Sequence, residues 1–488
     1  MKRQRKLRKA KTHAENQRFR PWLCLAWQIE SMKKQGRETE EEQISDIISS
    51  LPDCMLAHIL SFLPTKHAIL TSILSSRWRV LWTLVPVLHL DKPTLDSIRT
   101  STLNYILFPR NPSTLCKLCI DCPRRSFVDK CVQAAILRGV QELDLVLDLV
   151  LDLHNQTKEL PASVFFCTTL VVLKLRGHFL LNPPDSASSS SSMFPSLKTL
   201  QISHVYYANH NSLSTLLPAC PLLQDLRIKV SDSDLDFLDK EADNKFNILV
   251  LVPTLKILVL DCSFLRWSFK LHINTPALEY FHFKGDLNSD VVSENLPNLF
   301  KSVLDVRNCY YLDWMWKLTN FMGLLCNIRS MELWIGTAEY ILEHSSSNSH
   351  YDVPMFHNLS SLKFYGDFWA MWSPWNAVQL LLCRAPKLQT LTFELNYRCC
   401  IRSFSVDFRL KKPLDVPECL SSHLTTCHYK GFSGHVMELV EQILKESKVL
   451  KTMKITFNSD LDSKEKLRIH KKIMKFPRTS QTCQIAFD

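Results

Sequence analysis

The chain has 488 residues, of which 46% are hydrophobic and 22% charged, and its formal net charge at pH 7 is +11. This length leaves room for several domains or one long array, and the balance of apolar and charged residues excludes a wholly disordered chain. Seventeen cysteines without a secretory signal predict a reduced, intracellular protein.

The positive charge is concentrated at the two ends. Residues 1–43 contain twelve Lys or Arg and six Glu, and residues 463–488 contain seven Lys or Arg and two acids. The region between them is therefore close to neutral, which is not typical of a nucleic-acid surface.

A basic run near the N-terminus resembles a nuclear-import signal, although a flexible, solvated tail is the other interpretation. The run consists of Lys2, Arg3, Arg5, Lys6, Arg8, Lys9 and Lys11. No apolar stretch of signal-peptide or transmembrane type follows it, so we expect no membrane partner and a location in the nucleus, the cytoplasm or both.

Residues 46–86 predict three short helices. Ser50 can cap the first, Pro52 suits its first turn, and the helix dipole favours Asp53 there. The helix carries an apolar stripe at i, i+3, i+4 and i+7, formed by Leu56, Ile59, Leu60 and Leu63. A second helix is predicted to begin near Thr65 after Pro64, and a third near Ser75, carrying Trp78, Leu81 and Trp82.

The apolar positions of this segment exceed what so small a unit can bury. Such a surplus indicates either half of an interface or an ordinary three-helix start to a globular domain. The segment resembles a plant F-box, and the resemblance rests on Leu51-Pro52-Asp53, residues 59–66, Ala68, Thr71, Leu74-Ser75, Arg77-Trp78 and Leu81-Trp82.

The resemblance implies that residues 44–90 form an F-box that docks onto the Skp-type adaptor of a cullin ubiquitin ligase. By position, it implies adaptor contacts for Leu51, Pro52, Leu56, Ile59, Leu60 and Leu63. It also implies that Trp78 and Trp82 hold the helices together.

From residue 115 onward one pattern recurs: apolar, two residues, apolar, one residue, apolar. Its ten copies begin at Leu115, Val140, Leu170, Leu197, Leu223, Leu255, Leu278, Ile328, Leu359 and Leu388. A strand that returns every 23–32 residues indicates a leucine-rich solenoid, and the one longer gap predicts a degenerate repeat around Leu299–Val306. We therefore expect an α/β fold in which residues 91–410 form an irregular solenoid with parallel strands on its concave side and variable outer segments.

Two local clusters within the array have alternative interpretations. Cys116, Cys119 and Cys122 have the spacing of metal ligands, but no fourth ligand follows at a suitable distance, so no metal is expected. The aromatic residues of Asp367–Trp375 form either a recognition patch or a plug of the core.

Residues 411–488 predict a C-terminal cap. Two further copies of the strand pattern begin at Leu424 and Leu450, and a helical stripe separates them, formed by Val436, Leu439, Val440, Ile443 and Leu444. The segment resembles the FBD domain of plant F-box/leucine-rich-repeat proteins, through Val416-Pro417-Glu418-Cys419-Leu420, Gly431-Phe432, Glu438-Leu439, Ile443-Leu444, Leu450-Lys451, Met453, Cys483-Gln484-Ile485 and Phe487.

Together these observations predict a substrate-recognition subunit of a ubiquitin ligase, with the repeats holding a protein target. No catalytic motif or cofactor site is readable, and neither the target nor its binding residues can be predicted. A binding scaffold with a degenerate F-box and a ligand-dependent receptor are the alternatives.

Overall fold

The structure is a computed structural model, and it divides into two compact units, Met1–Leu56 and Ala57–Asp488. The residues that it describes are 47–97, 107–108, 114–121, 125–147, 157–184, 193–236, 238, 245–264, 269–286, 290–294, 296–306, 314–338, 341, 353–369, 374–398, 416–434 and 437–488. The basic run at Lys2–Lys11 and Cys122 lie outside them, as do the side chains of Phe368, Trp369 and Trp372.

The first segment is helical, as its pattern predicts. Its elements are α2 (Ile47–Ser50), α3 (Asp53–Ser61), α4 (Thr65–Leu70), η1 (Thr71–Ile73), α5 (Trp78–Leu81) and η2 (Trp82–Leu84). Pro64 has an extended backbone and begins α4, so the predicted break between the first two long helices is confirmed. The third helix begins at Trp78 and not near Ser75, and no side chain caps it.

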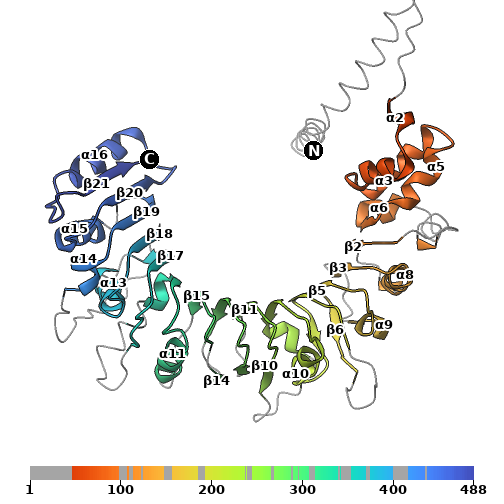
Figure 1. The fold of residues 1–488 in the computed structure, drawn as a ribbon, viewed down its shortest axis with the longest axis horizontal. Helices are drawn as coiled ribbons and strands as arrows, with labels where there is room; N and C mark the ends of the chain where they lie inside the picture. Colours follow the sequence, from red (N-terminus) through yellow and green to blue (C-terminus); the bar gives the residue numbers. More distant parts are fainter. Residues whose placement is uncertain are drawn as a thin grey trace, which may run out of the picture. The chain divides into compact units, whose positions relative to one another are not determined.

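One parallel sheet of 15 strands runs through Ala57–Asp488 (Figure 1). Its strands are β1 (Val87–Asp91), β2 (Lys117–Asp121), β3 (Glu142–Leu147), β5 (Val172–Gly177), β7 (Thr199–Ser203), β9 (Asp225–Ser231), β11 (Ile257–Phe264), β13 (Tyr280–Gly285), β15 (Lys301–Val306), β16 (Ser330–Trp334), β17 (Ser361–Trp369), β18 (Thr390–Arg398), β19 (Thr426–Phe432), β20 (Thr452–Phe457) and β21 (Gln484–Phe487). Each strand pairs in parallel with the next in this order, which confirms the predicted solenoid.

The second and third apolar positions of each repeat pattern form two buried rows across the sheet. In β5, for example, Leu173 and Leu175 are buried, whereas Lys174 between them is half-exposed. Large rings continue the second row near its end: Phe364 stacks on Phe393 at a centroid distance of 5.6 Å, and Phe393 stacks on Tyr429 at 5.2 Å. Alternation at period two therefore separates a core face from a solvent face in strands such as β1, β3 and β5, whereas β15 is buried on both faces from Ser302 to Val306.

Repeated backbone hydrogen bonds hold the strands in this register. The carbonyl of Gln141 accepts from the N–H groups of Val171 and Val172, and the carbonyl of Val171 accepts in turn from Lys198 and Thr199. The same double acceptance recurs at each step from Pro86, just before β1, to Thr425, just before β19. Each repeat thus fixes the starting point of the next strand.

The degenerate repeat predicted around Leu299–Val306 is present as β15. Its strand has Leu304 in the second buried row, but Ser302 stands in the first row, where the other strands from β1 to β20 have a larger side chain. The polar residue breaks the apolar pattern, and this is why the sequence showed a gap of two repeat lengths at this place.

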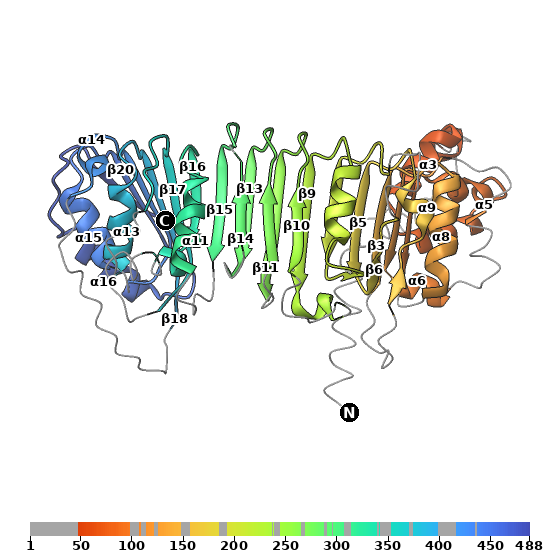
Figure 2. The ribbon, with the colours of Figure 1, turned by 90° about the horizontal axis from the view of Figure 1, so that it is seen from below.

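The outer segments vary, as expected. The longer helices α8 (Arg125–Leu137), α11 (Trp314–Gly323), α13 (Pro374–Cys383) and α15 (Met437–Glu446) lie on the same side of the large sheet (Figures 1 and 2). Between them, two small parallel sheets occupy that side, with the strands β4 (Lys158–Glu159), β6 (Phe179–Leu181), β8 (Tyr206–Tyr207), β10 (Phe246–Val250), β12 (Phe269–Ile273) and β14 (Asp290–Ser293).

At the two ends of the sheet the structure adds elements that the sequence did not reveal. β1 belongs to the sheet although the predicted F-box range reaches residue 90, and α6 (Lys92–Ser97) follows it. The predicted C-terminal strand–helix–strand unit is present as β19, α15 and β20, with Leu439, Val440, Ile443 and Leu444 buried. A further helix, α16 (Ser463–Ile473), then leads to β21.

Replacement of Ser302 by Ala is expected to stabilise the repeats. The Ser302 side chain is fully buried, and among the described residues its hydroxyl has no hydrogen-bond partner, so its removal ends a desolvation penalty. We expect a gain of about 1 kcal/mol, measured by urea denaturation followed by circular dichroism. Ser480→Ala is the control, because the Ser480 hydroxyl donates to the carbonyl of Leu450 at 2.6 Å and its loss should destabilise the protein. Equal losses in both variants would contradict this explanation of β15.

Replacement of Thr65 by Val is expected to loosen the attachment of α4 to the sheet. The N–H of His89 in β1 donates to Oγ1 of Thr65 at 2.8 Å, and Val keeps the shape but not the acceptor. We expect the free energy of local opening at His89 to fall by about 1–2 kcal/mol, seen as faster amide hydrogen exchange. Thr65→Ser retains a hydroxyl and should exchange like the native chain. An unchanged rate at His89 in Thr65→Val would show that this bond does not hold β1.

Candidate functional site

Large apolar side chains are exposed at high density along the helical segment. In Met1–Leu56 these are Ile48 and Met55, and in Ala57–Asp488 they are Ile59, Phe62, Leu63, Leu70, Ile73, Leu74 and Val80. The remaining described residues, although far more numerous, contain about as many exposed side chains of this kind. Exposed apolar surface at this density indicates a site for another protein.

The six residues for which the resemblance implied adaptor contacts fall into two groups. Pro52, Ile59 and Leu63 are exposed and Leu51 is half-buried. Leu56 and Leu60 differ from these four, since they are 0% and 1% exposed in the chain by itself, and their adaptor contacts stay a prediction.

This difference in burial has a simple cause. A stripe at i, i+3, i+4 and i+7 identifies the apolar side of a helix but not which of its members the rest of the fold covers. Phe62 lies off that stripe and was missed, although it is 74% exposed. Among the described residues, the one ring contact of Phe62 is with His58, one helical turn earlier, and the two ring centroids are 5.0 Å apart.

The helices after Leu56 are built into the same compact unit as the sheet. Ala68, Leu81 and Trp82 are buried, and the implied packing role of Trp82 agrees with this; Trp78 is half-buried. The hydrogen bond from His89 to Thr65 joins the start of α4 to the outer edge of β1. The exposed side chains of α4, η1 and α5 are therefore held on a fixed support.

The solvent face of the large sheet carries ladders of paired charges. Glu142 of β3 lies 3.0 Å from the Lys117 ammonium on one neighbouring strand and 2.9 Å from that of Lys174 on the other. A second ladder crosses four strands and links Lys301, Glu332, Lys363 and Glu394. Within these ladders most positive charges face a carboxylate.

The pKa values of the acids reflect this pairing. Burial opposes ionisation of Glu142, but the hydrogen bonds from Lys174 and Lys117 outweigh it and lower the pKa of its carboxyl below the usual range. The pKa of Glu332 is lowered in the same way. Burial alone would raise it, but the contacts with Lys301 and Lys363 have the larger effect. The carboxylates of both ladders are consequently ionised near pH 7; the second ladder balances two lysines with two glutamates, whereas the first has one lysine in excess.

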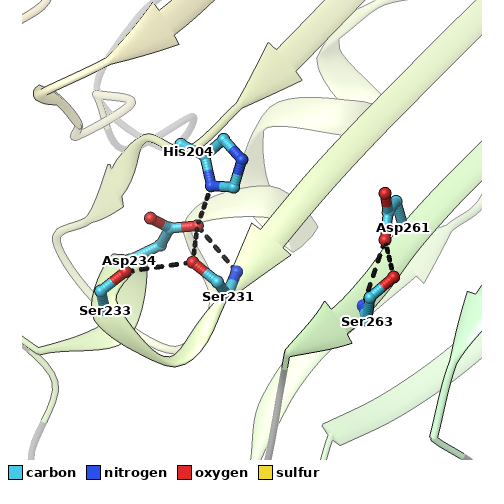
Figure 3. Close-up of polar contacts among 6 residues, drawn as sticks. All are labelled: His204, Ser231, Ser233, Asp234, Asp261 and Ser263. Atoms are coloured by element: carbon cyan, nitrogen blue, oxygen red, sulfur yellow. Dashed lines mark hydrogen bonds and ion pairs between the residues drawn. The ribbon is translucent and has the colours of Figure 1, made fainter. Parts of the chain in front are cut away.

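A serine–histidine–aspartate cluster at the end of β9 deserves comparison with a hydrolytic triad (Figure 3). The Ser231 hydroxyl and backbone N–H donate to Oδ2 of Asp234 at 3.0 and 2.7 Å, and Nδ1 of His204 lies 3.5 Å from that same oxygen. The histidine does not stand between the serine and the aspartate, so it cannot take the serine proton. The arrangement is a capping box for the helical turn Asp232–Leu235 (η5).

Burial raises the pKa of the Asp234 carboxyl, and the bonds from Ser231 and the nearby His204 reduce that effect. Asp261, in the neighbouring strand β11, accepts from the backbone N–H and the hydroxyl of Ser263, where the pairing with β9 is irregular (Figure 3). Both clusters are local contacts near the carboxyl ends of strands and have a structural role.

The metal-like spacing near β2 does not produce a ligand cluster in the described part of the chain. Cys116 is exposed and Cys119 is half-buried, and burial raises the pKa of the Cys119 thiol. Among the described residues no group of three or more potential metal ligands comes together. No described helix combines the length and the apolar character needed to cross a bilayer.

Sequence comparisons agree with the three parts of this architecture. An F-box domain profile matches residues 48–90, a profile of the leucine-rich repeats of FBD-associated F-box protein At5g56370 matches residues 128–242, and an FBD profile matches residues 412–455.

Relatives in Arabidopsis thaliana match nearly the whole chain. FBD-associated F-box protein At5g56370 is 30% identical over 466 residues, which cover 91% of this chain and 100% of that protein. The putative F-box/FBD/LRR-repeat protein At5g62970 is 28% identical over 476 residues, which cover 89% of this chain and 98% of that protein. F-box/LRR-repeat protein 13 is 27% identical over 483 residues, which cover 93% of this chain and 99% of that protein. From its helical segment to its C-terminal unit, this chain belongs to the plant F-box/FBD/leucine-rich-repeat proteins.

Proposed function

We propose that this protein is the substrate-recognition subunit of a Skp/cullin/F-box ubiquitin ligase. Its helical segment would bind the Skp-type adaptor, and through the adaptor a cullin, while its repeats hold a protein target. The observation that carries the proposal is the set of exposed apolar side chains on a segment that matches the F-box profile. Burial of such side chains against a partner is the main source of binding energy in protein association.

The proposed docking surface takes its strongest members from the end of α3 and the turn after it. Ile59, Phe62 and Leu63 are exposed there, and Pro52 and Leu51 precede them in the chain. Leu60 is buried and would support this surface from within. The distinction matters because a surface side chain can be changed without loss of the fold, whereas a core side chain cannot.

The repeats suit the second half of the proposed task. Fifteen strands present a solvent face whose side chains are not needed for the core, so they can be specialised for a target. In such a receptor the chemistry belongs to the ubiquitin-loaded enzyme, and the receptor raises the effective concentration of the target beside it. The chain would then need no catalytic residue of its own.

The exposed surface can be tested with Ile59→Asp combined with Phe62→Asp. Both side chains are already in water, so the fold should persist, but docking would bury two carboxylates without partners. We expect the dissociation constant for the Skp-type adaptor, measured by isothermal titration calorimetry with the full chain, to rise at least about a hundredfold.

A matched control is Leu222→Asp combined with Leu251→Asp. These side chains lie in the repeats and are 45% and 37% exposed, against 42% for Ile59. This variant should bind the adaptor like the native chain. If the native chain itself fails to bind the adaptor while other F-box proteins bind it, the ligase proposal is wrong and a scaffold with a degenerate F-box becomes the better account.

Leu60→Ala tests the proposal that Leu60 is a core side chain and not a surface contact. Since Leu60 is 1% exposed, its truncation should leave a cavity and lower the stability of the helical segment by about 2–5 kcal/mol. Amide hydrogen exchange in α3 and α4 would report this as faster opening in the absence of any adaptor. Unchanged exchange would place Leu60 back on the surface.

A further inference from the structure

A broad polar groove lies where four consecutive repeats enter β15, β16, β17 and β18. Its volume is about 980 Å³. It is lined by side chains from the turns just before these strands, namely Pro297, Asn298, Leu299, Phe300, Asn327, Arg329, Asn358, Ser360, Lys387 and Gln389. The groove thus runs along the rim of the sheet and is distinct from the solvent face that carries the charge ladders.

The lining combines two cations with several amides and contains no acidic residue. Arg329 and Lys387 are both exposed, and neither makes an ion pair with any described residue. This contrasts with the adjacent sheet face, where Lys301 and Lys363 are paired with Glu332 and Glu394. A surface with unpaired cations and amide donors favours a ligand rich in oxygen acceptors.

The positions of the two cations favour an elongated ligand. Arg329, Ser360 and Gln389 occupy equivalent places in successive repeats, because the backbone N–H of each later residue donates to the carbonyl of the one before. Lys387 lies two strands from Arg329 and two residues earlier in its repeat, which puts their Cα atoms about 12 Å apart. Alternate side chains of an extended peptide point to one side, and those at positions i and i+4 are about 13 Å apart.

We propose that this groove binds an extended acidic peptide segment, with acidic side chains at alternate positions reaching Arg329 and Lys387. The amides of Asn327, Asn358 and Gln389 lie between or beside the two cations and can bond to the peptide backbone. The inference deepens the proposed function, on which it rests, by giving the chemical class of the target segment. Carboxylates and phosphoryl groups share the required chemistry, and both occur on peptides.

Fluorescence anisotropy with the full chain can test the proposal. Three labelled nonapeptides of Ser and Gly would carry Asp, Asn or phosphoserine at positions 3, 5 and 7, and a labelled single-stranded RNA nonamer would be the fourth probe. We expect the Asp peptide to bind at least tenfold more tightly than the Asn peptide, with an affinity that falls as salt is raised from 0.05 to 0.3 M. Tighter binding of the phosphoserine peptide than of the Asp peptide would identify the phosphorylated form as the acid.

Two charge-matched double variants distinguish the groove from general attraction. Arg329→Glu with Lys387→Glu should weaken binding of the Asp peptide at least tenfold. Lys198→Glu with Lys451→Glu makes the same change in net charge at exposed positions equivalent to Arg329 in other repeats, and should change the affinity less than twofold.

Equal loss in both variants, equal binding of the Asp and Asn peptides, or tighter binding of the RNA than of any peptide would overturn the proposal. Failure here is separable from failure of the ligase proposal, because adaptor binding is measured independently with the Ile59 and Phe62 variant.

Discussion

The double hydrogen bond between successive repeats is the constraint on which the rest of this structure depends. In each repeat one carbonyl just before the strand accepts from two N–H groups of the next repeat, as Gln141 does from Val171 and Val172. This contact uses only the backbone, so it is independent of side-chain identity. It fixes the strand register, and the register decides which side chains enter the two buried rows and which reach solvent.

Because the register is set by the backbone, the solvent face and the rim are free to differ in chemistry. On the face, Lys117 and Lys174 both pair with Glu142, whereas at the rim Arg329 and Lys387 have no acidic neighbour among the lining residues. The helices after Leu56 are tied to this frame through Thr65 and β1. The exposed apolar side chains of the helices after Leu56 and the rim of the repeats therefore belong to one compact unit.

The repeated strands could be predicted because leucine-like residues at period two leave a direct trace in the sequence. β15 was visible only as a gap, since Ser302 occupies a buried row. β1 has a full copy of the pattern in Val85, Leu88 and Leu90, but it follows the helices directly and was counted with them. For the docking surface, spacing identified the apolar side of α3, but only the fold shows that Leu60 is covered and Phe62 is not. The groove depends on turns from four repeats lying side by side, which no local pattern encodes.

The central claim is that the helical segment binds a Skp-type adaptor while the repeats remain free for a target. Hydrogen–deuterium exchange of the full chain, with and without saturating adaptor, tests it most directly. The account predicts slower exchange in α3, η1 and the turn between α3 and α4, with unchanged exchange in β15 to β18. Protection in β15 to β18, or the absence of any protection between Ile47 and Leu84, would contradict it.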